Sequence, residues 1–247
     1  MSAGVSGWCQ GGISRGGDST HINNAAANEE YRDMTVFQTP APIDITLEVG
    51  AGTVSVIASD RIDTVVEVRP ADAGKKDDVK AAEQLKVEFG AGGLGVKMSK
   101  GWKVIGPSSG KGSVDVIIEV PAGSRVHGNL AHGKFHTAGE FGESSVEVAM
   151  GEIVIDRVVA AVTAKIAKGD ITIGDAVRGV LRLETSVGDV RVGIHPGSAA
   201  TVESNTLGGA MNTQLGPVDP AQSKTNVVEV HAHTASGNVA VGHSTAV

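Results

Sequence analysis

The centre of the chain repeats one short pattern three times: Gly151-Glu152-Ile153-Val154-Ile155, Gly169-Asp170-Ile171-Thr172-Ile173 and Gly188-Asp189-Val190-Arg191-Val192. The copies begin 18 and 19 residues apart, and each has a glycine, an acid, and two β-branched residues separated by one variable position. Side chains that alternate in this way point to opposite faces of a β-strand. Glycine fits a sharp turn because it adopts positive φ without a steric cost from Cβ. The pattern therefore predicts strands that turn at regularly spaced glycines.

Weaker copies of the pattern flank the central three, and their glycines are Gly52, Gly133, Gly209 and Gly237. A second alternating strand precedes each central copy, so one repeat contains two strands and two turns. Such a unit cannot bury both of its apolar faces alone, but coils stacked about 4.8 Å apart pair every strand with its equivalents. Ile153, Ile171 and Val190 then form one inward column. The sequence predicts an all-β fold: a single parallel β-solenoid, or β-helix-like domain, with coils of 18 to 19 residues.

The N-terminal segment differs from the rest of the chain. Residues 1–33 are rich in Gly, Ser and Asn and show no periodicity of strand or helix. They contain too little apolar area to offset the entropy cost of ordering, so we predict a disordered leader. Regular alternation begins after Met34, which favours Met34 as the natural start and residues 34–247 as one folded domain.

Within this domain the first half is less regular than the second. Residues 34–125 form either the first coils or a cap, with one short helix predicted over 77–86 and a glycine-rich loop over about 100–112. Strands are predicted in this half at 45–49, 54–58, 64–68, 85–89, 94–98 and 114–120. Residues 126–247 carry the regular repeats.

The composition excludes several classes of protein. Aromatic residues make up only 3% of the chain, so Val, Ile, Leu and Ala must fill the core. A net charge of -7 argues against a mainly electrostatic binder of nucleic acid or anionic membranes. The single cysteine, Cys9, forms neither an internal disulfide nor a thiolate zinc site. No segment resembles a membrane span or a secretory signal, so we predict a cytoplasmic protein without a cofactor.

Several segments resemble a known bacterial family. The glycine-acid repeats, the turn Val120–Ser124 (VPAGS) and the opening Val54–Arg61 (VSVIASDR) are similar to β-strand-repeat domains of unknown function that are labelled "putative adhesin" (domain of unknown function 4097). The resemblance covers about Met34 to Val241 and is to members of actinobacterial type. It implies a β-solenoid-like fold without catalytic residues, so it assigns no site residue and indicates that the chain is not an enzyme.

One loop carries sequences similar to two catalytic motifs. Gly106–Lys111 is one residue short of a phosphate-binding loop, and Gly112 stands where that motif has Ser or Thr. A nucleophile elbow around Ser108 needs a turn from strand to helix, but a strand is predicted next. We therefore interpret this segment as a flexible surface loop.

The same loop contains a candidate contact site for a partner. Trp102 lies among Lys100, Lys103 and Lys111 and is one of only two tryptophans in the chain. An exposed tryptophan beside cations suits contact with a partner or ligand. The alternative is that its ring covers one end of the solenoid.

Two groups of residues invite a metal site, although we predict none. The first is histidine: His127, His132 and His136 lie close in sequence, and His231 and His233 share one strand face. His127 has the opposite strand parity from His132 and His136, and the pattern places no further ligand. The second group is Glu152, Asp170 and Asp189, which would stack into a column of carboxylates. Because aspartate after glycine commonly bonds its own backbone in turns, a structural role is favoured.

Three functions are consistent with this sequence. The first is a non-catalytic interaction scaffold that presents flat polar strand faces to an unknown protein or glycan partner. The alternative is a self-assembling structural polymer, similar to the bactofilin-like cytoskeletal proteins, because uncapped solenoid ends expose unpaired strand edges. A carbohydrate-active β-helix enzyme ranks third, since it needs clustered carboxylates and aromatic platforms that a 3% aromatic content hardly supplies.

Overall fold

The computed structural model describes residues 33–90, 93–98, 112–216 and 226–244. Regular structure in this part of the chain is mostly β: fifteen strands belong to one sheet, accompanied by the helix α1 (Lys76–Gln84). The strands are β1 (Asp33–Gln38), β2 (Asp44–Ser59), β3 (Asp63–Pro70), β4 (Leu85–Gly90), β5 (Gly93–Met98), β6 (Val114–Pro121), β7 (Arg125–Ala138), β8 (Ser144–Val158), β9 (Val162–Ala176), β10 (Gly179–Val187), β11 (Val190–Ile194), β12 (Ala199–Gly208), β13 (Met211–Gln214), β14 (Val227–Ser236) and β15 (Val239–His243). Among the described residues, no helix is long and apolar enough to cross a membrane.

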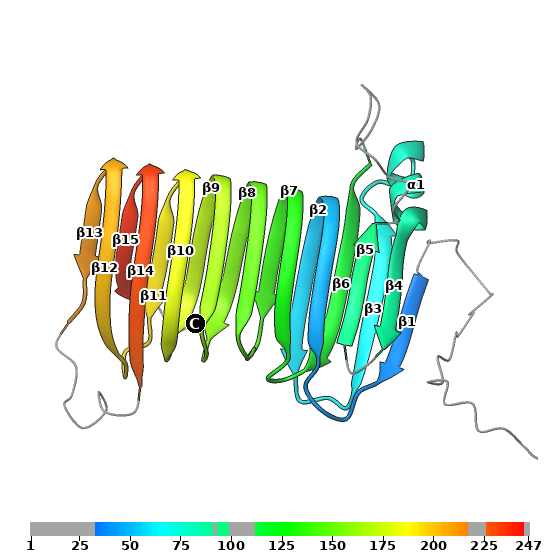
Figure 1. Ribbon diagram of the computed structural model, residues 1–247, viewed down its shortest axis with the longest axis horizontal. Coiled ribbons are helices and arrows are strands. Elements are labelled where there is room, and N and C mark those ends of the chain that lie inside the picture. Colours follow the sequence, from blue (N-terminus) through cyan, green and yellow to red (C-terminus); the bar gives the residue numbers. More distant parts are fainter. Residues whose placement is uncertain (1–32, 91–92, 99–111, 217–225, 245–247) are drawn as a thin grey trace, which may run out of the picture.

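The strands of the central repeats pair in parallel and in register (Figure 1). β8 lies beside β9 so that Ile153 is opposite Ile171, and β11 lies beside β9 so that Val190 is opposite Ile171. The predicted column is thereby confirmed, and each of its three side chains has 0% exposure. Full burial of one such side chain contributes about 1.5–3 kcal/mol relative to leaving it in water.

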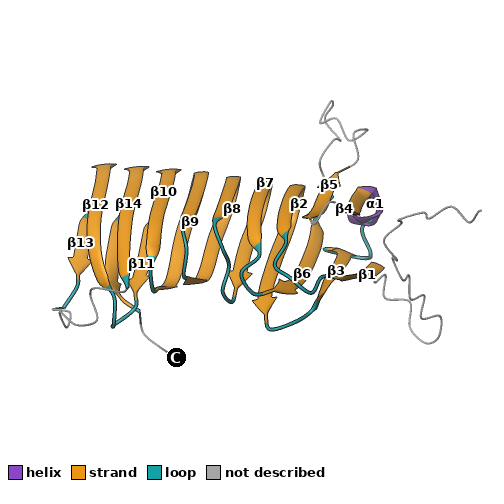
Figure 2. Ribbon diagram, turned by 60° about the horizontal axis from the view of Figure 1, so that its bottom comes forward, coloured by secondary structure: helices purple, strands orange, loops and turns teal. Residues whose placement is uncertain are grey.

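Glycine corners divide the long strands into two halves. β8 and β9 turn at Gly151 (φ 145°) and Gly169 (φ 138°), and every predicted turn glycine except Gly209 has positive φ. The half of β9 before its corner pairs with β10, whereas the half after it pairs with β11. Figures 1 and 2 show the sheet turning back at these corners, so the two halves face each other across the apolar core.

The last two repeats stand in the sheet in the reverse of their order in the chain. β14 lies between β10 and β12, and β15 lies between β11 and β13, although β12 and β13 come first in the sequence. Gly237 is therefore the neighbour of Gly188, and Gly209 belongs to the outermost strands. The physical reason is that the inward side chains of β14 are the more apolar at paired positions, with Val228 opposite Ala200 and Ala232 opposite Ser204. Val230 of β14 is fully buried in the inner position, whereas Val202 of β12 is only partly buried at the end of the sheet.

The opposite end of the sheet departs from the predicted parallel stack. β3 pairs antiparallel with β1 and β6, and β4 pairs antiparallel with β5. Only β4 and β5 are joined by a short connection, which permits an antiparallel pair. α1 packs against β3, β4 and β6 at this end (Figure 1). The helix predicted over 77–86 is confirmed, but it ends earlier, because the buried side chain of Leu85 begins β4.

An ion-pair cluster beside β3 and β6 predicts an acid-dependent contribution to stability. The Arg61 guanidinium donates to Asp63 (Nε to Oδ1, 2.8 Å) and to Glu119, and this bonding lowers the pKa of Asp63. A carboxyl with a lowered folded pKa stabilises the fold above its unfolded pKa and loses that contribution as pH falls through the folded value. We expect Asp63→Asn to reduce slightly the fall in melting temperature below about pH 4. A profile identical to that of the unsubstituted chain would contradict this.

Candidate functional site

The contact loop predicted from the sequence lies outside the described residues. This applies to Lys100, Trp102, Lys103 and Lys111, and also to the segment Gly106–Lys111. The described part of the chain contains a different candidate. It was not singled out by the sequence, apart from two of its histidines.

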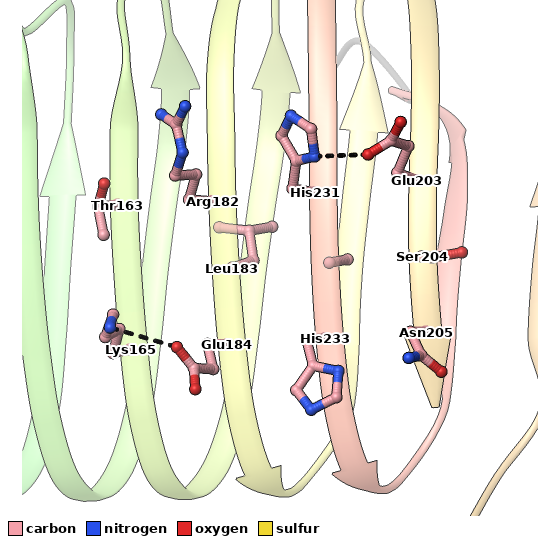
Figure 3. Close-up of a pocket in the computed structure, with 11 residues that line it drawn as sticks. Thr163, Lys165, Arg182, Leu183, Glu184, Glu203, Ser204, Asn205, His231 and His233 are labelled. Atoms are coloured by element: carbon pink, nitrogen blue, oxygen red, sulfur yellow. Dashed lines mark ion pairs between the residues drawn. The ribbon is translucent and has the colours of Figure 1, made fainter. Parts of the chain in front are cut away.

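A groove lies across the outer side of β9, β10, β14 and β12 (Figure 3). Its volume is about 540 Å³. These four strands are neighbours in the sheet in this order, although β9 and β14 are about 50 residues apart in the chain. The groove therefore exists only because the chain inserts β14 between β10 and β12.

Register explains why polar side chains gather in the groove. Alternate residues of each strand point outward, and parallel neighbours bring equivalent positions side by side. The first outward row consists of Thr163, Arg182, His231 and Glu203. The second outward row, two residues further along each strand, consists of Lys165, Glu184, His233 and Asn205. Neighbouring side chains within a row are one strand spacing apart, about 4.8 Å.

Some of the charged side chains in these rows form ion pairs. Lys165 Nζ lies 3.3 Å from Glu184 Oε2. His231 contacts two carboxylates, with Nδ1 3.0 Å from Glu203 Oε2 and Nε2 2.7 Å from Glu229 Oε1. A neutral imidazole carries one N–H, so hydrogen bonds to both carboxylates require the doubly protonated ring. The Lys165–Glu184 and His231–Glu203 pairs are drawn as dashed lines in Figure 3.

Two other groove side chains keep their hydrogen-bonding capacity available. Among the described residues, neither Arg182 nor His233 has an ion-pair or side-chain hydrogen-bond partner. The guanidinium of Arg182 presents five donors in a planar fork, which suits a carboxylate, a phosphate or a pair of hydroxyls. The groove can therefore bind a polar ligand through donors and acceptors at regular spacing.

The remaining predicted histidines do not form one cluster. His127 and His132 lie before the corner at Gly133, whereas His136 lies after it and contacts Asp156 (Nε2 to Oδ1, 3.0 Å). The predicted difference in parity is wrong, because the corner interrupts the alternation and leaves all three rings at the surface. Within the part of the chain that the structure describes, no group of three or more metal-ligating residues is present.

The predicted column of carboxylates is present, and its two aspartates accept backbone hydrogen bonds from neighbouring repeats. Glu152 lies beside Asp170, and Asp170 Oδ1 accepts a hydrogen bond from the backbone N–H of Asp189 at 2.8 Å. Asp189 Oδ1 in turn accepts from the backbone N–H of Asn238 at 2.9 Å. The sequence predicted that each aspartate bonds the backbone of its own turn. Asp170 and Asp189 instead accept hydrogen bonds from the backbone of the neighbouring repeat. Arg191 compensates the charge, with ion pairs to Asp170 (3.2 Å) and Asp189 (2.7 Å).

This column leads to a prediction about stability. We expect Asp189→Ala to lower the free energy of unfolding by about 0.5–1.5 kcal/mol, because the solvent-exposed N–H of Asn238 loses its protein acceptor. Asp189→Asn keeps an acceptor oxygen and should recover most of the loss. Urea unfolding measures both. Glu147→Ala is the control, since this carboxylate is exposed on the outer side of β8. A loss in the control equal to that of Asp189→Ala would refute the structural role of the column.

Comparisons with known proteins find no matching family model and no matching curated protein. Solved structures that align with most of the chain include a "putative cell adhesion protein" from Clostridium sporogenes, with 13% identity, 86% of this chain and 99% of that chain covered, and a TM-score of 0.44. A "putative adhesin" from Bacteroides fragilis has 10% identity, coverage of 86% and 98%, and a TM-score of 0.37. A "putative lipid binding protein" from Parabacteroides distasonis has 13% identity, coverage of 85% and 97%, and a TM-score of 0.30. The family resemblance of the sequence therefore stays a prediction.

Proposed function

We propose that this protein is a non-catalytic β-solenoid scaffold that binds a protein or glycan partner through the groove across β9, β10, β14 and β12. The observation that carries the proposal is the pair of in-register polar rows, which place eight side chains at one strand spacing on a single face. Stacked, mutually paired strands hold such side chains in place, so little conformational entropy is lost when a partner binds. The available donors of Arg182 and His233 supply specificity.

The solenoid part of the proposal rests on the repeat. Parallel pairing joins equivalent residues over the whole run β2–β7–β8–β9, with glycine beside glycine at the corners. Residues 34–247 then form one scaffold domain, and we keep the cytoplasm as its location and the Trp102 loop as a second predicted contact region. A partner that is long relative to one groove could contact several coils.

The bactofilin-like polymer is the less favoured alternative. Head-to-tail stacking requires both ends of the sheet to accept a further parallel coil. The two ends differ here, because β1, β3 and β6 pair antiparallel at one end, where α1 also packs. The observed asymmetry favours a scaffold of limited length over an open filament.

Site-specific photocrosslinking in the native host tests the proposal. A photoreactive residue at Thr163 lies in the groove, and one at Thr172 lies on the same strand beyond the glycine corner, on the opposite half of the sheet. Both positions are half-buried, so they form a matched pair. We expect one discrete adduct at Thr163 and none at Thr172. Equal labelling at the two positions, or no adduct at Thr163, would overturn the proposed site.

A second variant tests the chemistry of the groove. We expect Arg182→Ala to weaken the Thr163 adduct about tenfold or more, because a charge-assisted hydrogen bond contributes on the order of 1.5–3 kcal/mol. Arg191→Ala is the control, since this arginine lies on β11, on the opposite half of the sheet, and already pairs with Asp170 and Asp189. If Arg182→Ala and Arg191→Ala gave the same adduct yield, Arg182 would have no part in binding.

A further inference from the structure

The polar groove continues beyond the four strands described above. A second hollow, with a volume of about 310 Å³, lies over β7, β8, β9 and β10 and shares Lys165 and Glu184 with the first. The strands β7, β8, β9, β10, β14 and β12 are consecutive neighbours in the sheet. Five strand spacings of about 4.8 Å give the combined channel a length of about 24 Å. The long axis of this channel runs across the strands and not along them.

Pairing in register carries the second polar row across all six strands. On the β7 side the row gains Glu147, which lies opposite Lys165, and Asn129, which lies opposite Glu147. On β8, β9 and β10 the next outward positions hold small, exposed side chains: Ala149, Ala167 and Ser186. The long polar side chains of the row therefore stand beside a hollow, where a ligand can reach them from the side.

Hydrogen-bond donors and acceptors alternate along this row. The carboxylates of Glu147 and Glu184 accept, and the ammonium of Lys165 between them donates. Lys165 is 3.3 Å from Glu184, whereas Glu147 has no ion pair or side-chain hydrogen bond among the described residues. A polyanion would meet both carboxylates, and a polycation would meet Lys165 and Arg182. A chain of neutral hydroxyls suits the row, because each hydroxyl can both donate and accept.

A protein partner suits this channel less well than a chain of sugars. Protein interfaces are anchored by aromatic side chains at a dry centre, and none of the described residues that line the two hollows is Phe, Tyr or Trp. An extended peptide that crosses the strands advances about 3.3 Å per residue, out of step with side chains about 4.8 Å apart. One unit of an extended pyranose chain is close in length to one strand spacing, so successive sugars meet successive strands.

We propose that the ligand of the groove is a neutral, linear polysaccharide that lies across the six strands, with one sugar per strand and about six sugars in contact. This inference rests on the proposed function of the groove and names the class of its ligand. Sugar hydroxyls donate to Glu147 and Glu184 and accept from Lys165 and Arg182. Because the channel has no aromatic platform, each sugar contributes little, and affinity accumulates along the chain.

Titration calorimetry of the full chain with linear oligosaccharides tests the ligand class. The probes are β-1,4-linked gluco-, manno- and xylo-oligosaccharides of two to six units. For at least one series we expect each added unit to tighten binding about two- to tenfold, the gain from one net hydrogen bond. Maltohexaose, a coiled chain, and hexagalacturonate, with a carboxylate on every unit, should bind about tenfold more weakly or worse. No binding by any series, no gain with length, or equal binding of either comparison sugar would overturn the proposal.

A substitution in the second hollow tests the length of the site. We expect Glu147→Ala to weaken hexasaccharide binding about two- to tenfold, because an acceptor for sugar hydroxyls is lost. Glu152→Ala is the matched control and should leave the affinity unchanged. Glu152 is a carboxylate on the same strand, but it lies beyond the corner at Gly151 and pairs with Lys134. If Glu147→Ala bound the hexasaccharide as tightly as the unsubstituted chain, the site of six sugars would be refuted.

The photocrosslink at Thr163 separates this inference from the proposed function. A protein adduct at Thr163, together with no binding of any oligosaccharide, would overturn the polysaccharide and leave the groove as a contact site. No adduct at Thr163 and no binding of any oligosaccharide would overturn both. An adduct at Thr163 that contains carbohydrate, together with affinity that grows with oligosaccharide length, is the result that we expect.

Discussion

Replacing Gly169 with valine is expected to lower the free energy of unfolding by about 4 kcal/mol or more, whereas Ile171→Val should cost about 0.5–1.5 kcal/mol. Gly169 has φ 138°, and an added Cβ would lie 1.8 Å from the carbonyl oxygen of Gly151. The obstructing atom belongs to the backbone of another corner, which cannot move without breaking the pairing of strand β8 with its neighbours. Ile171→Val removes only one buried methylene.

A second glycine separates this steric effect from the loss of chain flexibility. Gly50 also lies in a long strand, but an added Cβ there has no atom within 4 Å. Gly50→Ala should change the free energy of unfolding by about 0.5–1 kcal/mol at most, and Gly169→Ala by several times more. Thermal and urea unfolding give the comparison. If Ile171→Val were more costly than Gly169→Val, the corner would not be where the fold is most constrained.

Exchanging Gly128 and Phe135 together for valine and isoleucine is expected to retain most of the stability that either substitution alone loses. The Phe135 side chain is 1% exposed, and its ring occupies the space beside Gly128, where a Cβ would lie 2.6 Å from ring atom Cε2. In the neighbouring strand β8, Val146 is the equivalent of Gly128 and Ile153 is the equivalent of Phe135. The double substitution therefore copies a pair that already packs in this core.

The single substitutions should each be costly for a different reason. Phe135→Ile leaves a cavity, which costs about 2 kcal/mol, and Gly128→Val overpacks the core, which costs about 1–3 kcal/mol. A double-mutant cycle measured by urea unfolding should give a favourable coupling of about 2 kcal/mol or more. The pair Val146→Ala and Val230→Ala offers a comparison between buried residues three strand spacings apart, about 14 Å, and should be nearly additive. Additivity at Gly128 and Phe135 would show that the ring does not fill that space.

The sequence predicted the local features of the fold well. The strands around Val54, Val87 and Val116, the helix before Leu85, and the column of Ile153, Ile171 and Val190 all appear in the structure. These features depend on alternation, helix propensity and corner glycines, which act between residues close in the chain. The same reasoning missed the antiparallel end, because a run of alternating residues is equally suited to parallel and antiparallel neighbours.

The candidate site was harder to foresee. His231 and His233 stood out in the sequence as a pair on one face, but as metal ligands and without their neighbours. Arg182 and Lys165 gave no signal, because single outward charges are common on every strand. Their only distinguishing property is the register, which aligns Arg182 with His231, 49 positions later, and Lys165 with Glu184 and through it with His233.

By itself, the sequence determined the unit of this protein: two short strands, a glycine corner, and an inward set of aliphatic side chains. Each of these follows from local sterics and from the burial of alternate residues. Only the tertiary structure decided that β14 stands between β10 and β12, and hence that two polar rows form a groove and that β12 is left at the edge. That order depends on which whole strand gains more by full burial, a comparison between distant segments that no local pattern contains.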